Sequence, residues 1–237
     1  MTLPEIRNIQ EPRKLVLAWI PSLANGPEHR TWRRVAELTR GPGDEPVTLT
    51  YLVGTPDYEE AVKRGFTGHP AFPAKQHVHK INVLESFLKR LPPRTRRDFP
   101  EYLEMFRLPA DAQISDFALL GYTEARLPSD DFAILLPLED FTTPFEVVTQ
   151  VSGVRHEVEV DLGKIQVGDT VTLQATPHPK DPHAVNVVWQ GHKLGHLPRL
   201  HAETLGRLAR EGRIHATIVR VNGSAERPVV RLFLAAK

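Results

Sequence analysis

The segment Ala184-Val-Asn-Val-Val-Trp-Gln-Gly-His-Lys-Leu-Gly-His-Leu197 decides the fold of the C-terminal half of the chain. Two runs of strand-forming residues, Ala184–Trp189 and Lys193–Leu197, lie on either side of Gln190-Gly191. A two-residue hairpin turn needs positive φ angles, which glycine adopts at little cost. The segment therefore predicts a tight β-hairpin.

Further short strands are predicted on both sides of this hairpin, each bounded by Gly, Pro or charged residues. They are Glu146–Val151, Thr170–Ala175, Ile214–Val221 and Val229–Leu234. One helix interrupts the series, from about Pro198 to Glu211, with Gly212 ending it. Short strands in series with a single helix are typical of a small closed or nearly closed barrel.

The first 143 residues have a mixed pattern. The helix Asp57–Arg64 follows Thr55-Pro56, and another is expected from Asn82, with Glu85 completing a capping box. The segment from Phe66 to Val78 is too rich in Pro, Gly and His for regular structure. The expected strands are Leu15–Ile20, Val35–Leu38, Val47–Leu52 and Asp131–Leu138, and two further short helices are expected near Pro100–Phe106 and Asp111–Leu119.

Thr142-Thr143-Pro144 reads as a short connection between two domains. The fold class expected is therefore α+β, with a mixed domain at residues 1–143 and a β-barrel with one or two short helices at residues 144–237. The composition, 41% hydrophobic and 25% charged, is that of a globular protein. Because no signal-peptide core or membrane-length apolar run is present, we expect a cytoplasmic protein with no membrane partner.

Charge is distributed unevenly along the chain. From Leu162 onward eleven basic residues face five acidic ones, a net charge of +6, and the first 161 residues carry −5 because the whole chain carries +1. A polyanion would therefore meet the C-terminal part first. Arg207, Arg210 and Arg213 lie in this part, either as a solvated helix face or as residues that steer a nucleic-acid backbone.

No feature of the sequence indicates catalysis. The chain has no cysteine, which excludes disulfides, thiolate zinc ligands and a cysteine nucleophile. A glycine-rich phosphate loop and a Gly-x-Ser-x-Gly elbow are also missing. His77 and His79 have the spacing of metal ligands, but their loop contains no Asp or Glu. We therefore expect no enzymatic activity, no cofactor and no metal.

Three segments in order resemble the sequence pattern of HIRAN domains. Val151-Ser-Gly-Val-Arg-His156 resembles the opening motif, and His178-Pro-Lys-Asp-Pro-His-Ala-Val185 resembles the family's turn and following strand. Lys193-Leu-Gly-His-Leu-Pro198 resembles the strand that ends at a helix. The resemblance implies an OB-like barrel and a non-catalytic function, the binding of single-stranded DNA ends that carry a free 3′ hydroxyl.

The resemblance also implies a DNA-binding set. Arg155 and Asp181 keep the family's arginine and its aspartate, which receives the 3′ hydroxyl, while His196 and Arg199 belong to or follow the third motif. His156 stands where a stacking aromatic is usual, and Lys180 replaces a tyrosine, so one stacking platform is lost. His183 completes the set.

Other interpretations of these residues remain open. Arg155 and Asp181 could form an ion pair that braces the barrel, and His196 could be a strand residue with a satisfied ring. By resemblance the partner is single-stranded DNA or a DNA end, and the setting is DNA repair in a bacterium. The alternative is a protein-interaction or toxin–antitoxin-type regulatory module in which the barrel is a scaffold.

The N-terminal half is similar, over looser motifs, to the small N-terminal subdomain of HipA-type toxin kinases. The motifs are Val35-Ala-Glu-Leu38, Leu49-Thr-Tyr-Leu52, Gly68-His-Pro-Ala-Phe-Pro73 and Phe87-Leu-Lys-Arg-Leu-Pro92. Because kinase signatures are missing, this similarity implies regulation by binding only, with a possible protein partner for the N-terminal domain.

Overall fold

The computed structural model describes residues 3–21, 31–41, 43, 45–127, 129–157, 161–176, 181–224 and 227–237. The chain forms two compact units. The N-terminal unit comprises Glu11–Phe99 and Gln113–Pro137, and the C-terminal unit comprises Met1–Gln10, Pro100–Ala112 and Leu138–Lys237. The division into domains at residues 1–143 and 144–237 stays a prediction.

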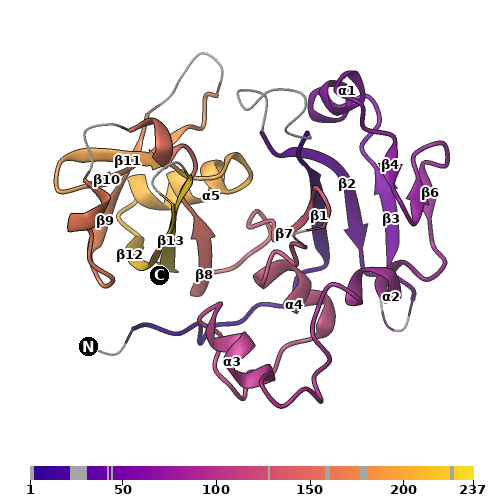
Figure 1. Cartoon of the computed structure of the whole chain (residues 1–237), viewed down its shortest axis with the longest axis horizontal. Coiled ribbons are helices and arrows are strands. Elements are labelled where there is room, and N and C mark those ends of the chain that lie inside the picture. The colour runs from indigo at the N-terminus through magenta and orange to yellow at the C-terminus, as the bar shows by residue number, and fades with distance from the viewer. Residues whose placement is uncertain are drawn as a thin grey trace. The chain divides into compact units, whose positions relative to one another are not determined.

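The N-terminal unit is mostly sheet and is built on five antiparallel strands in the order β6-β3-β2-β1-β7 (Figure 1). The inner strand β1, which lies between β2 and β7, is buried along nearly its whole length, as expected for the apolar run Leu-Val-Leu-Ala-Trp. The strands are β1 (Lys14–Trp19), β2 (Arg33–Thr39), β3 (Thr48–Tyr51), β6 (Val78–His79) and β7 (Phe132–Leu135).

The N-terminal unit also contains the short helices α1 (Pro56–Lys63), α2 (Val83–Leu88) and α4 (Asp116–Tyr122). The helix α3 (Phe99–Glu104) lies almost wholly in the C-terminal unit. Thr55 caps α1 as predicted, since its side chain accepts from Tyr58 N. The capping box predicted at Asn82 is wrong. Asn82 adopts a left-handed conformation with φ 54°, and its side chain makes no capping hydrogen bond.

The prediction that residues 66–78 lack regular structure is also wrong. β4 (Gly68–His69) and β5 (Phe72–Pro73) form a two-stranded ladder, which is too short to produce a detectable periodicity. The Tyr51 hydroxyl fastens this ladder to the sheet by donating to the Phe72 carbonyl oxygen and accepting from the His69 N–H at 2.9 Å. Burial raises the pKa of Tyr51 to about 12, so the hydroxyl stays protonated.

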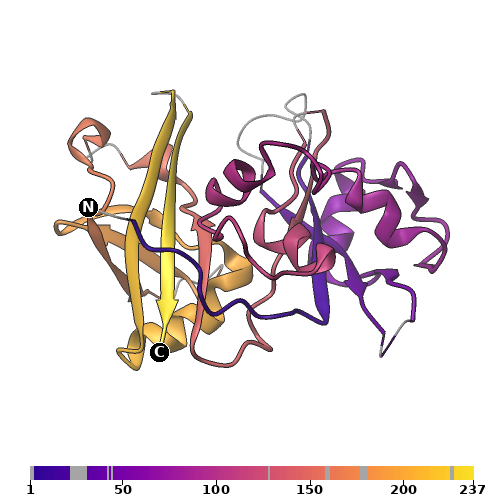
Figure 2. The same cartoon turned by 90° about the horizontal axis from the view of Figure 1, so that it is seen from below.

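The C-terminal unit contains a curled antiparallel sheet in the order β11-β10-β9-β12-β13-β8, which is consistent with the predicted OB-like fold (Figure 1). Figure 2 shows β12 and β13 as a long ribbon. The strands are β8 (Phe145–Gln150), β9 (Thr170–Ala175), β10 (Val185–Trp189), β11 (His192–His196), β12 (Ile214–Ser224) and β13 (Arg227–Ala236), with the 3-10 turns η3 (Val154–His156) and η4 (Leu162–Lys164).

The hairpin predicted at Gln190-Gly191 is confirmed. Both residues have positive φ, 48° and 85°, as a primed two-residue turn requires. The helix α5 (Arg199–Arg210) is also confirmed, and Gly212 ends it with φ 67°. Its apolar face, which includes Leu205 and Leu208, packs on β9 and β12.

Two segments from earlier in the chain belong to the C-terminal unit. The Glu146 carboxylate on β8 accepts hydrogen bonds from the N–H of Asn8 at 2.6 Å and of Arg7 at 3.2 Å. The guanidinium of Arg231 on β13 lies 5.7 Å from the ring centre of Phe106. These contacts fix residues 3–10 and 100–112 on the same unit as the curled sheet.

Candidate nucleic-acid interface

His196 is the residue at which the three sequence motifs meet. Its backbone N–H and carbonyl both pair with Ser152 of the first motif, each at 2.8 Å. On its other side, His196 is the register partner of Asn186 on β10, the strand that follows the second motif. The third motif therefore lies directly between the first and the second.

The Ser152–His196 bridge also joins the two ends of the curled sheet. β8 and β11 are the edge strands, and Ser152 follows β8 by two residues. Gly195 makes this approach possible. A Cβ atom at Gly195, whose φ is 149°, would lie 2.5 Å from the Ser152 carbonyl oxygen and 2.7 Å from Val151 Cγ1. Only glycine fits here without displacing backbone.

Arg155 and His156 extend from η3 into solvent beside this bridge. Gly153 starts the turn with φ 82°, and a Cβ there would lie 3.5 Å from Cδ2 of the His196 ring. Val154 is buried and anchors the turn, while Arg155 Nε donates to His156 Nε2 at 3.0 Å. Arg155 and His156 are exposed. The first motif thus presents a cation and an imidazole three and four residues after Ser152, the residue that pairs with His196.

Asp181 shapes the turn that leads into β10. Its carboxylate accepts from His183 N at 3.1 Å, and its carbonyl accepts from Ala184 N at 3.1 Å. This is an Asx turn, which orients Asp181 through its own backbone. His183 is exposed on this turn. Lys180, the residue predicted in place of a stacking tyrosine, lies outside the described residues.

Arg199 is exposed at the first position of α5, three residues after His196. Within the same helix His201 is buried, and its Nδ1 lies 3.2 Å from the Thr149 hydroxyl on β8. His201 therefore helps to hold α5 on the sheet. His201 belongs to none of the three sequence motifs. Its position on the apolar face of the helix could have indicated that it is buried.

An ion pair that sequence reasoning missed links the first and third motifs. Lys193 Nζ on β11 lies 2.8 Å from the Glu157 carboxylate, directly after η3. The positive charge of Lys193 is therefore paired with the neighbouring Glu157 carboxylate. The cations of this face that the structure describes as exposed are Arg155 and Arg199.

No group of three or more His, Asp or Glu side chains in the described ranges is placed to hold a metal ion. Among the helices of those same ranges, none is long and apolar enough to cross a membrane.

The C-terminal part of the chain matches a known protein family. Residues 144–235 match the model of the HIRAN domain, which confirms the predicted family for this region. Two solved structures are similar at 22% identity and a TM-score of 0.30. The match to the HIRAN domain of human HLTF covers 39% of this chain and 77% of the HLTF chain. The match to a Lactobacillus plantarum protein covers 38% of this chain and 92% of that protein's chain.

No curated protein matches the chain. The comparisons give no support to the resemblance between the N-terminal half and HipA-type kinases, or to a bacterial source.

Proposed function

We propose that this protein binds single-stranded DNA or a DNA end through the face around His196 and has no catalytic activity. The observation that carries the proposal is the meeting of three motifs at His196, which pairs with Ser152 on one side and Asn186 on the other. This face lies within the region that matches the HIRAN domain, a family that suggests DNA binding. From the resemblance alone, we propose DNA repair in the bacterial cytoplasm as the setting.

Each exposed group on this face has a role that its chemistry supports. The guanidinium of Arg155 suits a phosphate, because charge-assisted hydrogen bonds to phosphate oxygens are short and strong. The neighbouring His156 ring offers a face on which a base can stack. Arg199 stands at the start of α5, where the helix N-terminus also favours an anion.

The carboxylate of Asp181 has a different role, because it repels phosphate. It accepts one hydrogen bond from its own turn, and a carboxylate has room for about three more. A terminal sugar hydroxyl is the donor that such a group can recognise on DNA. Asp181 therefore favours a 3′ hydroxyl over a 3′ phosphate in this proposal.

Fluorescence anisotropy with labelled single-stranded oligonucleotides tests the proposal directly. We expect binding that weakens steeply with added salt, since counterions are released from the strand. We also expect a 3′-hydroxyl oligonucleotide to bind more tightly than its 3′-phosphate counterpart. Equal affinity for the two ends would remove end recognition from the proposal. Absence of binding to either would favour the alternative, a protein-interaction module.

A further inference from the structure

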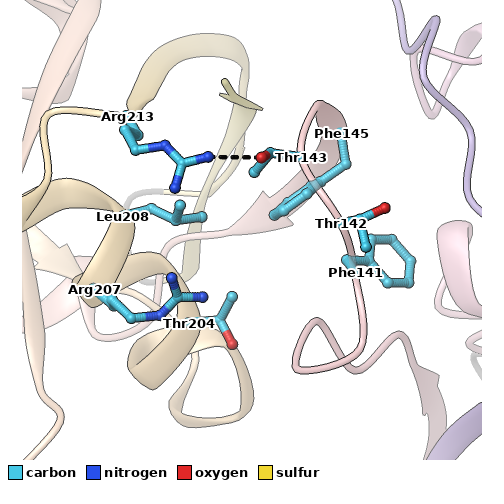
Figure 3. Close-up of a pocket in the computed structure, with 8 residues that line it drawn as sticks. All are labelled: Phe141, Thr142, Thr143, Phe145, Thr204, Arg207, Leu208 and Arg213. Carbon is cyan, nitrogen blue, oxygen red and sulfur yellow. Dashed lines mark hydrogen bonds between the residues drawn. The ribbon is translucent and has the colours of Figure 1, made fainter.

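A hollow of about 300 Å³ lies in the C-terminal unit, between the C-terminal end of α5 and the loop before β8 (Figure 3). Arg207 and Arg213 line it together with Thr142, Thr143 and Thr204. We propose that this hollow holds an internal phosphate of the same DNA strand whose end lies at His196. The inference rests on the proposed DNA binding and adds a second contact to it.

Arg213 is the fixed element of the hollow. Its Nε donates to a main-chain oxygen of Lys237 at 2.8 Å. Its Nη2 donates to the Thr143 hydroxyl at 2.7 Å, as Figure 3 shows. Its Nη1 lies 3.2 Å from a Glu211 carboxylate oxygen. These partners use three of the five N–H donors of the guanidinium. The remaining donors belong to a group whose orientation is already set.

Arg207 is the adjustable element. Its guanidinium lies 3.6 Å from Glu211, an ion-pair distance that is too long for a hydrogen bond. In the part of the chain that the structure describes, it makes no hydrogen bond, and 55% of its side chain is exposed. Glu211 therefore offsets one of the two positive charges, and several N–H donors of the two arginines stay unused.

The remaining walls suit the sugar beside a phosphate. Leu208 is buried between the two arginines, and Phe145 is buried across from it. Phe141 is half-buried, and its ring packs edge-on against Phe145 at 5.5 Å between centres. An apolar wall beside two guanidinium groups fits a nucleotide of a strand better than a fully hydrated free anion.

α5 connects the hollow to the face around His196. Its exposed residues Arg199, Glu203 and Arg207 are spaced four apart and so lie on one side of the helix. Arg199 and Arg207 are eight residues apart, about 12 Å along the axis at 1.5 Å per residue. Single-strand sites on OB-like folds extend over about 4–16 nucleotides. A bound strand therefore continues past its terminal nucleotide, and this side of α5 is basic on balance.

The test compares Arg207→Ala with the unchanged protein on a trinucleotide and a 12-nucleotide strand with the same 3′ end. We expect the 12-mer to bind about fivefold more weakly to the variant, as for the loss of one charge-assisted contact. The slope of log binding constant against log salt concentration should become shallower by about 0.7, the value for one contact with a single-strand phosphate. The trinucleotide should lose less affinity, because its two internucleotide phosphates also have to contact the face around His196.

Arg97→Ala is the matched control, because it removes one exposed arginine from the N-terminal unit. It should leave both affinities unchanged. Glu203→Gln removes the carboxylate between Arg199 and Arg207, and we expect it to tighten binding of the 12-mer about twofold, by removing one like-charge repulsion.

Inorganic phosphate distinguishes a free-anion site from a strand site. If millimolar phosphate binds the protein and Arg207→Ala abolishes this, while 12-mer affinity is unchanged, the hollow takes free anions and our inference is wrong. Equal 12-mer affinity and salt slope for Arg207→Ala and the unchanged protein also overturns it. Failure of the protein to bind any oligonucleotide refutes the proposed function instead.

Discussion

Gly195 and Ser152 approach so closely that a Cβ atom on Gly195 would lie 2.5 Å from the Ser152 carbonyl oxygen. This contact permits the only backbone pairing that the described residues show between the β8 end of the curled sheet and β11. The face around His196 therefore depends on one glycine with φ 149°. A change that breaks the Ser152–His196 bridge should therefore also disrupt the candidate interface.

We predict that Gly195→Ala lowers the free energy of unfolding by about 2–3 kcal/mol, since a backbone atom must move and the φ is strained. Urea denaturation measures this change. Gly191→Ala is the control, because Gly191 also has a positive φ, 85°, but open space around it. It should cost only about 1 kcal/mol. Similar losses in the two variants would mean that the close approach to Ser152 is unimportant.

Arg155→Ala should weaken single-stranded DNA binding by about 1–3 kcal/mol, because a charge-assisted phosphate contact is lost. The side chain is exposed, so the fold should be unaffected. Arg155→Lys keeps the charge but not the planar donors, and it should recover part of the affinity. Anisotropy titrations of the three proteins provide the comparison. Unchanged affinity in Arg155→Ala would remove Arg155 from the interface.

Asp181→Ala should erase the preference for a 3′ hydroxyl over a 3′ phosphate while leaving general affinity unchanged or slightly higher. The physical reason is that the carboxylate repels phosphates and helps only by accepting from a sugar hydroxyl. Because the same carboxylate accepts from His183 N, the alanine variant also loses an Asx turn. Asp181→Asn keeps an acceptor for that turn and is the control. A preference that survives in Asp181→Ala would assign end recognition to another group.

Local patterns in the sequence predicted much of the C-terminal half. The turn at Gln190-Gly191 and the helix end at Gly212 follow from which residues tolerate a positive φ, a property of one or two residues. The pairing of Ser152 with His196 could not be predicted in the same way. It joins residues 44 positions apart, and nothing in the local pattern of either segment specifies the other.

The remaining errors have equally specific causes. Asn82 and Glu85 have the spacing of a capping box, but asparagine also tolerates the left-handed region, and tertiary context selects that conformation here. The β4–β5 ladder pairs only two residues on each side and depends on the hydroxyl of the distant Tyr51. The hollow at Arg207 and Arg213 combines a helix end with a loop some 60 residues earlier. Each of these features is fixed by packing between distant segments.

His69 supplies a prediction about acid stability in the N-terminal unit. Its ring packs against Phe72, Phe87 and Phe132, with ring centres 4.9–5.6 Å away, and Nδ1 accepts from Ala71 N at 3.2 Å. Burial lowers the pKa of His69 to about 4, aided by the nearby Arg90 guanidinium and opposed by Asp130. Arg90 and Asp130 themselves form a bidentate ion pair, with contacts of 2.6 and 2.9 Å.

The direction of the effect follows from proton uptake. Between pH 6.5 and about 4, the unfolded chain holds a proton on His69 and the folded chain does not, so the free energy of unfolding falls as the pH falls through this range. Allowing for partial solvent screening, we expect His69 to account for about 2 kcal/mol of that loss. The contribution is complete near pH 4, where the folded form also begins to bind the proton.

His69→Asn is the variant that isolates this contribution, because an amide oxygen can still accept from Ala71 N but does not titrate. It should be less stable than the unchanged protein at pH 7, since packing against the three phenylalanines is lost. Between pH 7 and 4.5, however, its free energy of unfolding should fall by about 2 kcal/mol less. Urea denaturation at both pH values gives the two differences, and the carboxylates that titrate in this range are common to both proteins. Equal losses on acidification would mean that His69 keeps an ordinary pKa in the folded state.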